Sequence, residues 1–126
     1  MAHIRRFAMI AALVVGVVVP LLGQEGQQPY KVKDPGVTAP AIIKEVHPRY
    51  TDEAKEKKIQ GLVELEAVVL EDGTVGDVTV TKSLDATYGL DQSAVAALVQ
   101  WQFKPGQKDG KAVKVLVEVE MTFTLK

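Results

Sequence analysis

VKVLVEVEMTFTL, residues 113–125, is the stretch that decides the fold. Apolar side chains occupy every odd position from Val113 to Leu125, whereas most even positions carry lysine, glutamate or threonine. Successive side chains of a β-strand point to opposite faces of a sheet, so a period of two residues is typical of a strand with one buried face. The stretch therefore predicts one long strand that buries a single row of side chains.

Two segments upstream have the same period. In residues 62–70, Val63, Leu65, Ala67 and Val69 lie on one side and Glu64 and Glu66 on the other. Within the segment 75–81, residues 78–81 alternate between valine and threonine. Asp72 and Gly73 lie between the two segments and are a strong signal for a hairpin turn. These segments are predicted to form two further strands, paired antiparallel through that turn.

Two short helices are expected beside the strands. Residues 51–59 begin with Thr51 as N-cap and carry acidic residues in the first turn and lysines in the last, which suits the helix dipole at both ends. Asp91 is expected to cap a second helix, whose apolar side chains recur at helical spacing as far as Trp101. We expect Trp101 to lie in the core because it falls on that apolar stripe.

The order of these elements indicates the fold class. Strands and helices do not alternate as they do in parallel α/β folds, and each strand has one apolar face. The sequence therefore predicts an α+β fold with a three-stranded, mainly antiparallel sheet and two helices packed on one face.

The 126 residues suit one domain preceded by a leader and a linker. Residues 7–22 form an apolar run behind a positively charged start, and the run is intermediate in length between a signal-peptide core and a membrane span. Residues 1–23 are interpreted as a signal peptide or an N-terminal membrane anchor, residues 24–40 as a linker and residues 41–126 as the folded domain. With either leader, the domain is expected outside the cytoplasm.

No catalytic or metal site is indicated. The chain contains no cysteine and two histidines, and His3 belongs to the leader, so a triad or a metal site would have to be built around His47 alone. The net charge of −1 does not favour nucleic acid or anionic lipid as a partner. We therefore expect no enzyme activity and no cofactor.

Four short motifs occur in one order and together resemble the TonB C-terminal domain family. They are HPRY at 47–50, DGTV at 72–75, WQFKP at 101–105 and DGK at 109–111, the last directly before the long alternating segment. The resemblance covers residues 36–126. It implies a periplasmic module that binds other proteins.

The resemblance also implies a partner and a mode of binding. Members of the family pair an edge strand with the TonB box, a short segment of an outer-membrane TonB-dependent transporter, and touch the transporter again just before the first helix. The expected partner-binding residues are therefore His47, Pro48, Arg49, Tyr50, Lys114, Leu116, Glu118, Glu120 and Thr122. An edge strand offers unpaired N–H and C=O groups to any extended peptide, which supports this mode on physical grounds. The sequence leaves open which half of the N–H groups along residues 114–124 points outward.

Two questions of function stay open at this level. The resemblance implies that an energy transducer of this family has an anchor helix with polar contacts to motor proteins, followed by a long spacer. Here the apolar run holds no Ser, Thr or His, and the 17-residue linker spans about 50 Å at most. Coupling to the proton-motive force through inner-membrane motor proteins is therefore left open, as is the transporter's identity. The alternative is a structural domain whose edge strand pairs with a second copy in a strand-exchanged dimer.

Overall fold

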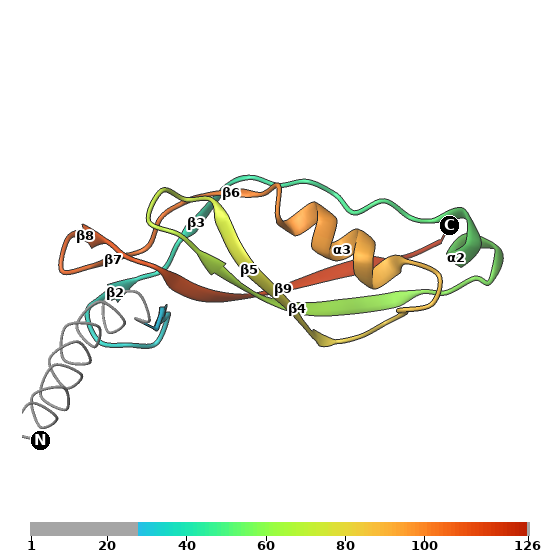
Figure 1. The fold of residues 1–126 in the computed structure, drawn as a ribbon, viewed down its shortest axis with the longest axis horizontal. Coiled ribbons are helices and arrows are strands. Elements are labelled where there is room, and N and C mark those ends of the chain that lie inside the picture. The colour runs from blue at the N-terminus through green and yellow to red at the C-terminus, as the bar shows by residue number, and fades with distance from the viewer. Residues whose placement is uncertain (1–27, 126) are drawn as a thin grey trace, which may run out of the picture.

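The computed structural model describes residues 28–125 of the chain. Its main sheet has four strands in the order β1-β9-β4-β5, and the short β1 runs parallel to β9 while the other neighbours are antiparallel (Figure 1). The bounds of these strands are Tyr30–Lys31 for β1, Gly61–Val69 for β4, Val75–Lys82 for β5 and Val115–Phe123 for β9. The predicted α+β fold and its three antiparallel strands are confirmed, and β1 is an addition to them.

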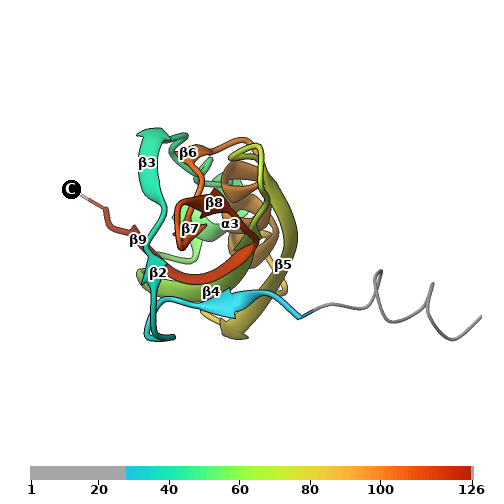
Figure 2. The same cartoon turned by 90° about the vertical axis from the view of Figure 1, so that its left-hand side faces the viewer.

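Two helices pack against this sheet. The helix α3 (Leu90–Leu98) lies across one face, over β4 and β5, and α2 (Asp52–Glu56) lies at the end of the sheet where β4 begins and β9 ends (Figure 1). Figure 2 shows the sheet curving around α3 from β5 towards β9. The core between them is made by the alternating residues of the strands, among them Val63, Leu65 and Phe123, which are almost fully buried.

Five further strands were not predicted. They form a three-stranded sheet and a two-stranded sheet beside the main one. Their bounds are Val37–Thr38 for β2, Gln107–Lys108 for β7, Lys111–Ala112 for β8, Ala41–Lys44 for β3 and Gln102–Lys104 for β6. Each is two to four residues long, too short to leave a clear period in the sequence.

The predicted hairpin turn between β4 and β5 is present. The Asp72 carboxylate accepts hydrogen bonds from the Thr74 N–H at 3.0 Å and the Thr74 hydroxyl at 2.6 Å, and the bond from the hydroxyl is the main cause that lowers the pKa of Asp72. Gly73 has φ 88°, and a Cβ there would lie 2.0 Å from the carbonyl oxygen of Phe103. Only glycine fits, because the turn packs directly on the backbone of β6.

The second helix begins differently from the expectation. Its N-cap is Gly89, in the left-handed conformation at φ 98°, and the helix ends at Leu98, before Trp101. The prediction that Asp91 caps the helix is wrong. The Asp91 carboxylate instead accepts hydrogen bonds from the N–H groups of Leu84 and Asp85, both at 3.0 Å, and from the hydroxyl of Ser83.

A second buried acid takes over part of the capping. The Asp85 carboxylate accepts hydrogen bonds from the N–H of Leu90, the first helical residue, at 3.2 Å, and from Thr87 and Tyr88 in the loop. Burial opposes ionisation of Asp91, but its hydrogen bonds with Ser83, Asp85 and Leu84 outweigh burial, so its pKa lies below the ordinary value. Two acids thus accept hydrogen bonds from five backbone N–H groups between β5 and the first residue of α3.

The first helix is shorter than expected. Thr51 is its N-cap as predicted, accepting a hydrogen bond from the Ala54 N–H at 3.2 Å. The helix ends at Glu56 rather than near residue 59, because Lys58 adopts the left-handed conformation at φ 56° and the Ile59 N–H turns back to the Ala54 carbonyl.

Trp101 lies in the core as expected, although it follows α3 rather than belonging to it. It is 7 % exposed, its ring centre lies 6.1 Å from that of Phe103, and its Nε1–H donates to the Val46 carbonyl at 2.9 Å. The tryptophan therefore ties the segment before α2 to the end of α3.

The structure describes the segment interpreted as a linker, residues 24–40, from residue 28 onward, and this part contains two short paired strands. β1 pairs with the start of β9, and β2 pairs with β7. The leader, residues 1–23, lies outside the described residues. Within residues 28–125, no helix is long and apolar enough to cross a membrane.

Candidate partner-binding edge

The strand β9 is the candidate site because it lies at one edge of the main sheet except where β1 covers it. Its register with β4 runs without a break from Gly61 opposite Phe123 to Val69 opposite Val115. A strand without bulges alternates strictly in the direction of its N–H and C=O groups. One contact with a known direction therefore fixes the direction of all of them.

Two hydrogen bonds give that direction. The Tyr30 N–H in β1 donates to the Lys114 carbonyl at 2.9 Å, so Lys114 turns its backbone groups outward, away from β4. The Leu125 N–H donates in the opposite direction, to the Gln60 side chain ahead of β4, at 2.9 Å. In this segment, the backbone N–H and C=O groups of even-numbered residues therefore point outward, and those of odd-numbered residues point towards β4.

The outward residues coincide with the even-numbered positions named from the family resemblance, and the structure divides them into two groups. Within residues 28–125, β1 pairs only with Val115 and Leu116, so Lys114 and Leu116 lie on the covered part of the edge. Residues 117–123, here termed the open part of β9, have no strand on their outer side in the described chain. Their outward backbone groups belong to Glu118, Glu120 and Thr122.

Side chains on the two faces of this edge differ in character. Val117 and Val119 are half-buried on the core face. On the other face, Glu118 lies directly opposite Glu66 and Glu120 directly opposite Glu64. Carboxylates opposite each other across two strands repel, so the solvent face beside the open part of β9 is anionic and carries a small cost in stability.

The segment before α2 is held in place by backbone contacts. The Val46 carbonyl accepts from Trp101, the Tyr50 hydroxyl donates to the Ile59 carbonyl, and the Thr51 hydroxyl donates to the Tyr88 carbonyl at 2.7 Å. The Tyr50 ring packs edge-on against Phe123, with ring centres 5.4 Å apart. Tyr50 therefore belongs to the fold and reaches the end of β9.

The other predicted residues of this segment do not line the open edge. Pro48 is half-buried, and His47 and Arg49 are exposed. The side chains of His47 and Arg49 border a shallow hollow of about 330 Å³, whose opposite wall is formed by Gln92, Ser93 and Ala96 of α3 and by Gln100 just after it. The structure thus brings Tyr50 to β9 and directs His47 and Arg49 towards α3. Within residues 28–125, no three His, Cys, Asp or Glu side chains are grouped so that they could hold a metal ion.

The cover that β1 provides was not predicted from the sequence. A signal for it was available, because residues 30–33 read YKVK and alternate between a large or apolar side chain and lysine. The segment was too short, and too close to prolines and glycines, to stand out from a linker.

A small α+β domain with a bulge-free and partly open sheet edge is the class that these observations define. Comparison with known proteins then identifies the family: the chain belongs to the TonB C-terminal family, whose model, described as Gram-negative bacterial TonB protein C-terminal, matches residues 46–125.

One relative and one solved structure illustrate the match. The chain is 33% identical over 90 residues to Protein TonB of Vibrio cholerae serotype O1, an alignment that covers 71% of this chain and 36% of that protein. The chain therefore spans about a third of that relative's length. The solution NMR structure of the Pseudomonas aeruginosa TonB C-terminal domain matches with a TM-score of 0.57 and 20% identity, over 79% of this chain and 97% of that one, which shows a common fold.

Proposed function

We propose that this domain is a periplasmic protein-binding module that pairs the open part of β9 with an extended segment of an outer-membrane TonB-dependent transporter. One observation carries the proposal: the backbone groups of Glu118, Glu120 and Thr122 point outward from a bulge-free strand and meet no other strand in the described chain. Family membership favours the transporter as the partner.

The expected strength of such pairing follows from the number of groups available. Each of the three outward residues has one N–H donor and one C=O acceptor. A typical backbone hydrogen bond contributes about 0.5–1.5 kcal/mol net, so a peptide paired along this edge gains several kcal/mol before the cost of ordering it. This favours a reversible contact whose selectivity comes from side chains on alternate positions.

Binding of synthetic peptides from the N-terminal segments of candidate transporters tests the proposal. Fluorescence polarisation should detect binding to the wild-type domain and its loss in Glu120→Pro, because proline removes the outward N–H at that position. Glu120→Ala is the matched control: it removes the same carboxylate but keeps the N–H, and it should bind. Equal binding by all three proteins would contradict strand addition at this edge.

Self-association through the same edge is the competing function. Two copies of β9 paired antiparallel would place Glu118 and Glu120 of one copy beside the same residues of the other, and like charges across neighbouring strands are destabilising. The charge pattern therefore supports a different chain as the partner. A size-exclusion series should show one elution volume at all concentrations, and a shift towards twice the mass would support the dimer instead.

The leader decides whether the module is free or tethered. Cleavage behind the apolar run 7–22 would release a periplasmic protein beginning near Gln24, whereas an uncleaved run would hold the module at the inner membrane, within reach of motor proteins. We expect the cleaved form. Intact-mass measurement on protein from the cell envelope checks this, and finding Met1 or Ala2 at the N-terminus in the inner-membrane fraction would favour the tethered, energy-coupled form.

A further inference from the structure

β1 occupies the part of the β9 edge directly before the open part that the proposed partner would use. It pairs in parallel with Val115 and Leu116, and its Tyr30 N–H donates to the Lys114 carbonyl at 2.9 Å. The lysine ammonium of Lys108 lies over the Tyr30 ring, 5.5 Å from its centre. The chain thus supplies a strand of its own at the position where a foreign strand would be added.

The segment leaves the edge abruptly after two residues. The Asp34 N–H donates to the Lys31 carbonyl at 3.0 Å, and the Asp34 carboxylate accepts from the Lys31 N–H at 2.8 Å. This turn stops β1 from continuing along β9. Without it, the parallel register would carry Lys33 to a position beside Glu118.

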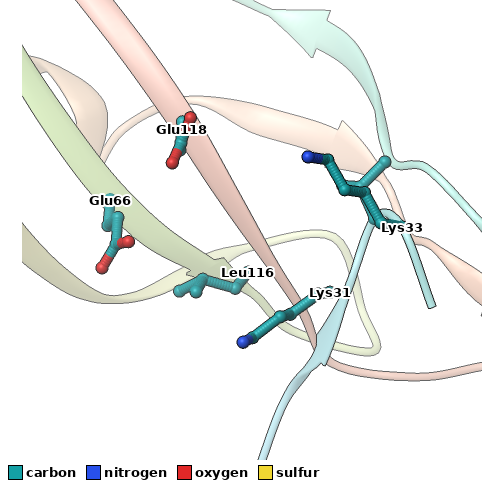
Figure 3. Close-up of a pocket in the computed structure, with 6 residues that line it drawn as sticks. Lys31, Lys33, Glu66, Leu116 and Glu118 are labelled. Carbon is teal, nitrogen blue, oxygen red and sulfur yellow. The ribbon is translucent and has the colours of Figure 1, made fainter.

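The turn also lies next to the open part of β9. Lys31, Val32 and Lys33 line a hollow of about 460 Å³ together with Glu66, Leu116 and Glu118, and Figure 3 shows the two lysines across the hollow from the two glutamates. Glu118 is the first outward residue of the open part. A strand that pairs with Glu118 therefore meets the β1 turn, where lysines and glutamates of opposite charge line one hollow.

We propose that β1 is a displaceable internal strand that competes with the partner for the start of β9. This inference rests on the proposed function and specifies how its site is regulated. When β1 leaves, the edge open to a partner extends from residues 117–123 back to Lys114 and Leu116. The contact is small, two residues of ladder and one turn, so it can be exchanged for a longer foreign strand.

The variant Tyr30→Pro tests the contact directly, because it removes the N–H that donates to Lys114. Tyr30→Ala is the matched control, since it removes the ring and keeps the N–H. Parallel pairing turns the Leu116 N–H towards β1. Amide exchange at Leu116 should accelerate about 10-fold or more in Tyr30→Pro and less in Tyr30→Ala, while the exchange of Glu120, beyond β1, stays unchanged.

A synthetic peptide with the sequence of residues 28–34 serves as the probe for competition. In nuclear magnetic resonance titrations it should shift the Leu116 resonance of Tyr30→Pro and leave the wild-type protein unaffected, because the attached strand has a far higher effective concentration. A second variant, Lys31→Glu with Lys33→Glu, keeps every N–H and should act in the same direction by repelling Glu66 and Glu118. Unchanged exchange at Leu116 in both variants, equal peptide binding by wild type and variant, or no binding to either would overturn the inference.

The transporter peptides of the preceding section separate the two proposals. Removing a ladder of this size should tighten their binding to Tyr30→Pro about 10-fold. If they bind wild type and Tyr30→Pro equally well, competition by β1 is wrong and strand addition stands. If they bind neither protein while amide exchange at Leu116 is still faster in Tyr30→Pro, the β1 contact stands and the proposed transporter partner is wrong.

Discussion

The two edges of the main sheet, β5 and β9, are built differently. The pairing of β5 with β4 shifts register twice, between Glu64 and Leu65 and between Ala67 and Val69, and in both places β5 contributes the extra residue. The pairing of β9 with β4 has no shift over its nine residue pairs. Bulges bend a strand and interrupt the regular row of backbone groups, so they discourage a further strand from adding.

The surroundings of the edges differ in the same sense. β5 carries the exposed Lys82 near its end and lies beside α3, with Val80, Val95 and Ala96 lining an apolar hollow between them. β9 has only the two residues of β1 on its outer side within residues 28–125. The comparison shows that edge position alone does not make a binding site: β5 is a protected edge, and β9 is one that the chain covers in part.

Prolines placed along β9 should either unfold the domain or abolish partner binding, depending on the direction of the N–H group that they remove. Val117→Pro and Val119→Pro remove N–H groups that face β4 and should abolish the cooperative unfolding transition. Glu118→Pro and Glu120→Pro remove outward N–H groups, so they should keep the fold and lose the partner. Circular dichroism measures whether each variant is folded, and titration with transporter peptides measures whether it still binds.

The protected edge supplies the control. Val80 lies opposite Leu65, whose own N–H faces β9, so the Val80 N–H points away from β4. Val80→Pro should therefore keep both the fold and the binding. Loss of binding in this variant would mean that β5 also serves the partner, and the contrast between the edges would be wrong.

Truncation of Trp101 should weaken the two edges equally, because the side chain belongs to the core rather than to either strand. Trp101→Ala removes a buried aromatic side chain and the hydrogen bond to Val46, and should lower the free energy of unfolding by about 3–5 kcal/mol in denaturant titration. Trp101→Phe, which loses the hydrogen bond but keeps most of the volume, should cost less. A change below about 1 kcal/mol for Trp101→Ala would show that the side chain is dispensable for packing.

Asp91→Asn should loosen the β5 side alone. Its carboxylate accepts hydrogen bonds from Leu84, Asp85 and Ser83, so the neutral amide should lower the free energy of unfolding by about 1–3 kcal/mol and speed amide exchange in β5 more than in β9.

The effect of Asp91 on stability should depend on pH. The folded pKa of Asp91 lies below its unfolded value, so its contribution to the free energy of unfolding is full above the unfolded pKa of about 3.9 and is lost as the pH falls through the folded pKa. The stability difference between wild type and variant, measured from pH 7 to pH 2, should therefore shrink below about pH 4. A constant difference would assign the effect to shape rather than charge.

The long strands could be predicted from the sequence because alternation over several residues reports burial of one face. The ends of β4, β5 and β9 were all predicted to within two residues, and Thr51 was predicted as a cap because its role is local. Asp91 was misassigned for the opposite reason. Asp85 and Asp91 both precede or begin the helix, and which of them caps it depends on how the loop folds back on the sheet.

The candidate site was predictable in part. The outward residues Glu118, Glu120 and Thr122 follow from the period of the strand once one backbone direction is known, and the sequence does not contain that direction. The grouping of His47 and Arg49 with the edge depended on the family resemblance, whereas the structure turns both side chains towards α3. Contacts between distant short segments, such as β1 with β9, leave almost no local pattern to read.

The smallest expected effect concerns the charges across the centre of the sheet. Glu120 lies opposite Glu64 on β4, and Glu64 lies opposite Lys82 on β5, so Glu120→Lys should replace a repulsion by an attraction and raise the free energy of unfolding by about 0.2–1 kcal/mol. Glu118→Lys makes the same replacement opposite Glu66 but places the new charge beside Lys31 and Lys33, so it should stabilise less. Both gains should fall in 1 M salt, where the screening length is about 3 Å. Because each variant keeps its outward N–H, peptide binding should persist. Any change in peptide affinity then measures how strongly binding depends on the charge of this edge. Equal stabilisation by the two variants would show that the lysines of the β1 turn do not act on Glu118, and the covered half of the edge would then be held by backbone contacts alone.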